Sequence, residues 1–97
     1  NHSPKHSEAY VLLANLYSSI DKIKESVDFY KQALRVDPNN PEIYMLLGNA
    51  HYLDEDFEKA IQSYRASISL APMNDEYRLV YSQVMEDFVD AKEGSNG

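Results

Sequence analysis

Residues 7–40 have the sequence SEAYVLLANLYSSIDKIKESVDFYKQALRVDPNN, and residues 41–74 have the sequence PEIYMLLGNAHYLDEDFEKAIQSYRASISLAPMN. With a step of 34 residues, several identical residues fall in phase between the two stretches. The matched pairs are Tyr10/Tyr44, Leu12/Leu46, Leu13/Leu47, Asn15/Asn49, Tyr30/Tyr64, Pro38/Pro72 and Asn40/Asn74. A fixed period of this length indicates stacked supersecondary units, in which each unit needs a neighbour to cover its apolar face.

Apolar spacing and helix-breaking residues predict five helices. They cover residues 7–19, 22–36, 41–53, 57–70 and 75–92. Ser7, Asn40 and Asn74 are the expected N-caps, and Asp21 is expected to start the second helix. In the first helix, six apolar positions fall at helical spacing: Ala9, Tyr10, Leu13, Leu16, Tyr17 and Ile20. Period-2 alternation never persists, so an all-α fold of antiparallel helical hairpins is predicted.

The residues that recur are those of a known repeat pattern: an aromatic, Leu-Gly, Tyr, Ala, an aromatic and Pro. The first unit places Tyr10, Leu13, Ala14, Tyr17, Ser26, Tyr30, Ala33 and Pro38 at these positions, and the second places Tyr44, Leu47, Gly48, His51, Ala60, Tyr64, Ser67 and Pro72. Both units resemble the tetratricopeptide repeat. The resemblance implies an α-solenoid with right-handed superhelical stacking.

The repeat phase also predicts the organisation of the chain. Residues 7–40 and 41–74 are the two repeats, residues 75–92 a capping helix, and residues 93–97 a disordered tail. The third unit departs from the pattern, because Arg78 replaces the aromatic residue and no second helix follows. Pro4 precedes Pro38 by 34 residues, so residues 1–6 resemble the end of a preceding repeat, which indicates a piece of a longer array.

In this family the first helix of each hairpin lines a concave surface that binds ligands. Carried over by position, the resemblance implies that this surface contains Glu8, Val11, Leu12, Asn15, Ser19, Glu42, Met45, Leu46, Asn49, Leu53, Glu76, Leu79, Val80, Gln83 and Asp87.

Three rows follow from this placement, and each has two interpretations. The amides of Asn15, Asn49 and Gln83 could pair with a peptide backbone or tie neighbouring helices together. The apolar row (Val11, Leu12, Met45, Leu46, Leu79, Val80) could bind a partner or pack into the helix seam. The glutamates Glu8, Glu42 and Glu76 could select a basic ligand or complement the helix dipoles.

The charge of the chain restricts its partners. Sixteen acidic residues face nine basic ones, giving a net charge of −7, and no cluster of Lys and Arg suggests nucleic acid or an anionic membrane. We expect a protein or peptide ligand that is apolar or basic. Relatives that clasp the acidic tails of heat-shock chaperones carry cations where this chain has Val11, Asn15, Leu46, Glu76 and Val80. A chaperone carboxylate tail is therefore not expected.

Catalysis, a bound metal and a cofactor are not expected either. His2 and His6 precede the first predicted helix, His51 takes a core aromatic position, and the acidic turn 54–56 lacks the glycine of an EF-hand loop. The chain has no cysteine, which fits a reducing, cytoplasmic or nuclear location, and no apolar run approaches the roughly 18 residues of a membrane span.

Three functions are compatible with these features. The first is a scaffold or adaptor module that holds a peptide or helix of a partner in its concave groove. The second is self-association as a homodimer through the last helix, which is apolar on more than one side. The third is a regulatory segment of a larger protein.

Overall fold

The computed structural model describes residues 4–96, and within that range it contains five helices and no strand. They are α1 (Pro4–Ser19), α2 (Ile23–Val36), α3 (Pro41–Leu53), α4 (Phe57–Leu70) and α5 (Asp75–Asn96). The predicted all-α fold is confirmed. Two of the helices, α3 and α4, have the bounds that the sequence predicted.

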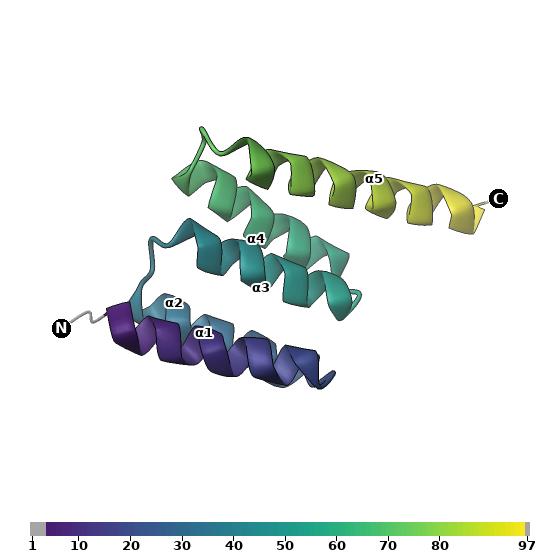
Figure 1. Cartoon of the computed structure of the whole chain (residues 1–97). Helices are drawn as coiled ribbons and strands as arrows, with labels where there is room; N and C mark the ends of the chain where they lie inside the picture. Colours follow the sequence, from purple (N-terminus) through teal and green to yellow (C-terminus); the bar gives the residue numbers. More distant parts are fainter. Residues whose placement is uncertain (1–3, 97) are drawn as a thin grey trace.

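The helices are stacked in chain order. α1 pairs with α2 and α3 with α4 as antiparallel hairpins, α2 contacts α3, and α5 packs on α4 (Figure 1). The molecule is thin and elongated, with extents of 52 × 32 × 16 Å. Each helix thus contacts mainly its neighbours in the chain, which is the organisation of a solenoid.

Side-chain caps explain where the later helices begin. Asn40 Oδ1 accepts hydrogen bonds from the backbone N–H groups of Glu42 (3.0 Å) and Ile43 (3.4 Å). Asn74 Oδ1 accepts one from Tyr77 at 3.1 Å. Both predicted caps are confirmed, and Pro41 occupies the first helical position, where a missing N–H is harmless.

The two ends of the chain differ from the prediction. α1 begins at Pro4, so Ser7 is a buried residue inside the helix and not its cap. Residues 4–6 of the predicted 1–6 segment are helical, because proline is tolerated in a first turn, and residues 1–3 lie outside the described part. α5 continues past Lys92 to Asn96, so residues 93–96 of the predicted tail extend the helix, since no proline stops it.

The turn inside each hairpin contains a residue with left-handed backbone geometry. Asp21 has a φ of 65° and Glu55 a φ of 60°, and the two positions are 34 residues apart. Asp21 therefore lies in the turn and does not start α2, which is preceded by Lys22. Only glycine adopts this geometry freely, since a Cβ atom in the left-handed region costs about 1–2 kcal/mol.

Replacement of Glu55 by glycine is therefore expected to raise the free energy of unfolding by about 0.5–1 kcal/mol. Chemical denaturation followed by circular dichroism measures this change. Glycine at the adjacent Asp54, whose φ is −84°, is the matched control and should lower stability, because there it only adds freedom to the unfolded chain. A gain at Asp54 equal to that at Glu55 would refute the conformational explanation.

The core consists of two clusters, one for each helix junction. The first lies between α1, α2 and α3 and contains Ala14, Val27, Tyr30, Leu47 and Ala50. The second lies between α3, α4 and α5 and contains Met45, Ala60, Tyr64 and Val84. At Gly48 a Cβ atom would lie 2.6 Å from Tyr64 Cε1. The absence of a side chain at this position therefore permits the close approach of α3 and α4.

The apolar face predicted for α1 is only partly covered. Leu13 is 39% exposed, Leu16 60% and Ile20 56%, and Ala9 is exposed as well. We call these four residues the outer stripe of α1. The expectation that all apolar positions of the first helix reach a core is wrong, because α2 covers one side of α1 and the outer stripe lies on another.

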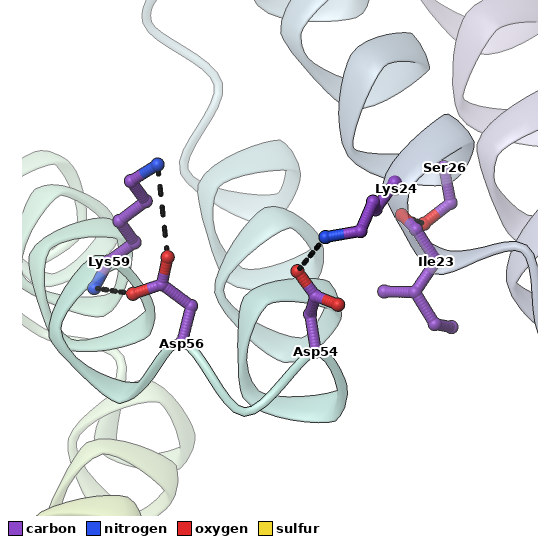
Figure 2. A network of polar contacts seen from close by, with 6 residues as sticks. All are labelled: Ile23, Lys24, Ser26, Asp54, Asp56 and Lys59. Atoms are coloured by element: carbon purple, nitrogen blue, oxygen red, sulfur yellow. Dashed lines mark hydrogen bonds and ion pairs between the residues drawn. The ribbon is translucent and has the colours of Figure 1, made fainter.

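Ion pairs add little to this framework. Lys24 of α2 lies 3.6 Å from Asp54 at the end of α3, and Lys59 lies 3.8 Å from Asp56, whose carboxylate also caps α4 (Figure 2). The lysine side chains are largely exposed, and exposed pairs contribute little to stability. The Lys24–Asp54 pair joins the two hairpins at a single point.

Candidate functional site

The repeat places equivalent residues of α1, α3 and α5 in rows across the stack. α1 and α3 lie on the same side of α2 and α4 (Figure 1). Ten of the fourteen predicted groove residues are exposed: Glu8, Leu12, Asn15, Ser19, Glu42, Asn49, Leu53, Glu76, Leu79 and Gln83. Val11, Leu46 and Val80 are half-buried.

Met45 is the exception. Its side chain is buried in the second core cluster with Ala60, Tyr64 and Val84. The prediction that Met45 offers surface to a ligand is wrong, since this position points into the junction between α3, α4 and α5. The exposed part of the apolar row is provided mainly by Leu12 and Leu79.

A hollow of about 320 Å³ lies where α1 faces the start of α3. Four of its lining residues were predicted from the sequence: Glu8, Val11, Leu12 and Glu42. Four others were missed: Ser7, Asp37, Asn40 and Ile43. Three of these eight residues are carboxylates and none is a lysine or arginine.

The missed residues come mainly from the loop between the hairpins. Asp37 Oδ2 accepts a hydrogen bond of 2.9 Å from Asn40 Nδ2, and Asn40 in turn caps α3. The carboxylate is therefore held at the edge of the hollow. The Asp-Pro-Asn-Asn loop was visible in the sequence, but its place beside the groove follows only from the stacking of the hairpins.

The acidic row has an electrostatic role at two of its three positions. Glu42 and Glu76 lie in the first turns of α3 and α5, where a carboxylate complements the helix dipole. Burial first, then the charges of Glu42 and Glu76, raises the pKa of the nearby Tyr77 phenol. Glu8 is not in the first turn of α1, so the dipole does not account for it.

The amide row ties the two helices of each hairpin together. Asn15 Oδ1 accepts a hydrogen bond from the Tyr30 hydroxyl. Asn49 Oδ1 accepts the equivalent bond, at 2.5 Å, from Tyr64. Burial raises the pKa of Tyr64 to about 12, so its phenol remains protonated and donates at neutral pH. Each bond occupies the amide oxygen and leaves the N–H groups of the exposed side chain for another acceptor.

The third unit has a different arrangement. Gln83 Nε2 donates to Asp87 Oδ1 at 3.4 Å, and the Tyr52 hydroxyl donates to Asp87 Oδ2 at 2.9 Å. The hydrogen bond to Asp87, followed by burial, raises the pKa of Tyr52. Asp87 therefore connects α5 to α3 instead of joining two helices of one hairpin.

Other predicted features have structural roles. His51 is buried, and desolvation lowers its pKa, so its imidazole is neutral at pH 7. Asp56 caps α4 as the acidic turn suggested. Within residues 4–96, no helix has the length and apolar character to cross a membrane.

Comparisons with known proteins support the repeat assignment. Residues 14–55 match a family model described as TPR repeat, and residues 41–74 match one described as tetratricopeptide repeat. Among solved structures, the fold is similar to that of the Sgt2 TPR domain from Aspergillus fumigatus, with a TM-score of 0.80 and 21% sequence identity. The match covers 89% of this chain but only 57% of that domain. No curated protein sequence matches the chain.

Proposed function

Because this chain belongs to the tetratricopeptide-repeat family, we propose that it binds a basic and apolar segment of a partner protein along α1, α3 and α5. Tetratricopeptide repeats form protein–protein interaction modules. The observation that carries the choice of ligand is the hollow between α1 and α3. Its apolar floor suits an aliphatic stem, and its three carboxylates suit a lysine or arginine head group.

The amide row supplies the second part of the recognition. The oxygens of Asn15 and Asn49 are occupied by tyrosine hydroxyls, so their free N–H groups favour acceptors. Backbone carbonyls of an extended segment are acceptors at regular spacing. The amides would therefore set the register of the ligand, while Leu12 and Leu79 provide apolar contact.

The expected affinity is modest. If Val11, Leu12, Leu46, Leu79 and Val80 each lose about 50 Å² to the ligand, the gross gain is about 6 kcal/mol. Association itself costs about 4–15 kcal/mol. Charge pairing in the hollow must therefore contribute, and the affinity of this chain should fall as salt is raised.

Selection of random 12-residue peptides on the full chain tests the proposal. The selected peptides should combine Lys or Arg with large apolar residues, and Glu42→Lys should weaken their binding by about tenfold, or about 1.4 kcal/mol. Asp28→Lys makes the same charge change at an exposed site on α2 and should leave the affinity within about twofold. Enrichment of acidic peptides, or equal losses in the two variants, would refute the proposed groove.

Self-association through α5 is a weaker candidate. The stripe that suggested it has its main surface turned toward α4, since Val84 is buried and Tyr77 and Tyr81 pack against the second cluster. Leu79 and Val89 remain exposed. A monomer mass that does not change with concentration in analytical ultracentrifugation would exclude a homodimer.

A further inference from the structure

The outer stripe of α1 is the face that every later first helix buries. Its residues Ala9, Leu13 and Leu16 are equivalent, by the 34-residue step, to Ile43, Leu47 and Ala50 of α3. Leu16 is 60% exposed and Leu13 39%, whereas Ala50 is 2% exposed and Leu47 6%. The difference comes from the neighbour, because α3 packs on the preceding α2, and the described residues place no helix on the corresponding side of α1.

The third unit repeats the same relation. The residues of α5 in this register are Tyr77, Tyr81 and Val84, and they pack on the cluster that contains Tyr64 of α4. Two of the three first helices thus use this face to contact the second helix of the hairpin before them. The outer stripe of α1 continues that series of interfaces.

The helices that cover this face share one pattern. α2 presents Ile23, Val27, Tyr30 and Leu34, and α4 has Phe57, Ile61, Tyr64 and Ile68 at the same positions. The common feature is a central tyrosine, with apolar residues three and seven positions before it and four after it. The spacing places all four on one helix face.

A hollow of about 400 Å³ beside the outer stripe is available for such a side chain. It lies between α1 and the end of α2 and is lined in part by Ala9, Leu13 and Val36. A docked helix could insert an apolar side chain there. This hollow is separate from the one that faces α3, since the two share no lining residue.

We propose that the outer stripe of α1 is a docking surface for the second helix of a further hairpin of this repeat, which carries the central tyrosine and flanking apolar residues found in α2 and α4. A second copy of the chain does not offer such a helix. The corresponding faces of α2 and α4 already contact α3 and α5. The proposed surface is distinct from the peptide groove and does not depend on the proposed function.

A chain extended by one hairpin tests the proposal. A copy of residues 7–40 is joined directly ahead of Ser7, so that its final asparagine precedes α1 as Asn40 precedes α3. Because the natural chain has no cysteine, Leu16→Cys in the original copy reports the exposure of the stripe. Its rate of maleimide labelling should fall at least about tenfold in the extended chain, and the melting temperature should rise by about 5–10 °C.

Leu70→Cys is the matched control, because Leu70 is 40% exposed at the far end of α4. Its labelling rate should be the same in both chains. Leu16→Glu should remove the gain in melting temperature that the added hairpin provides. Equal labelling of Leu16→Cys with and without the hairpin would overturn the proposal, as would a dimer of the natural chain that Leu16→Glu converts into monomers.

Discussion

Replacement of Tyr64 by alanine is expected to lower the free energy of unfolding by about 3–5 kcal/mol, as for other large aromatic residues removed from cores. Tyr64 is 1% exposed and lies in the second core cluster with Met45, Ala60 and Val84. Its ring also fills the space beside Gly48, where α3 and α4 approach most closely. Its loss would therefore leave a cavity at the junction of three helices.

Urea denaturation of the full chain measures this loss, and Tyr64→Phe separates its causes. Phenylalanine keeps the ring in the cluster but removes the hydroxyl that donates to Asn49 Oδ1. The expected loss is about 1 kcal/mol, because one hydrogen bond disappears and Asn49 is exposed to water. Equal losses in the two variants would show that the hydrogen bond, and not the ring packing, determines the effect.

Removal of α5 by truncation after Asn74 is expected to have the second largest effect. The deletion uncovers Met45 and Tyr64, which form one cluster with Val84. It also removes the bonds from Tyr52 to Asp87 and from Arg65 to Tyr81. Loss of these contacts should lower the free energy of unfolding by about 4 kcal/mol or more, since a fully buried apolar side chain contributes about 1.5–3 kcal/mol.

Thermal unfolding followed by circular dichroism measures the effect of the truncation. A chain ending at Glu93 keeps the α5 contacts just named and is the control for chain shortening. Val84→Asp in the full-length chain should reproduce most of the loss, because it places an unpaired carboxylate in the cluster. If the chain that ends at Asn74 melts at the temperature of the full chain, α5 does not stabilise the second hairpin.

Phe88 contributes less than a buried position would imply. Its ring is half-buried and lies 6.1 Å from the ring of Phe57, with the Lys92 ammonium 4.7 Å from its centroid. Full burial of this residue, expected from the apolar stripe of the last helix, is therefore wrong. The stripe turns away from α4 toward its end, and Val84 is its best-covered member.

The 34-residue repeat determined the hairpin architecture without any tertiary information. The caps at Asn40 and Asn74 and the break at Asp37-Pro38 depend on interactions within a few residues, so sequence alone predicts α3 and α4 correctly. The boundaries of α1 and α5 were less accurate, because no strong stop signal lies at the outer end of either helix. The exposed rows of glutamates and amides follow from the same period.

Only the tertiary structure decided which apolar residues are covered. Leu13 and Leu47 are identical in type and repeat position, yet one is exposed and the other buried. Met45 lies in the core although its position suggests the groove, and Asp37 joins the groove from a loop. Periodicity specifies the direction of a side chain from its own helix, but burial depends on whether another helix lies in that direction.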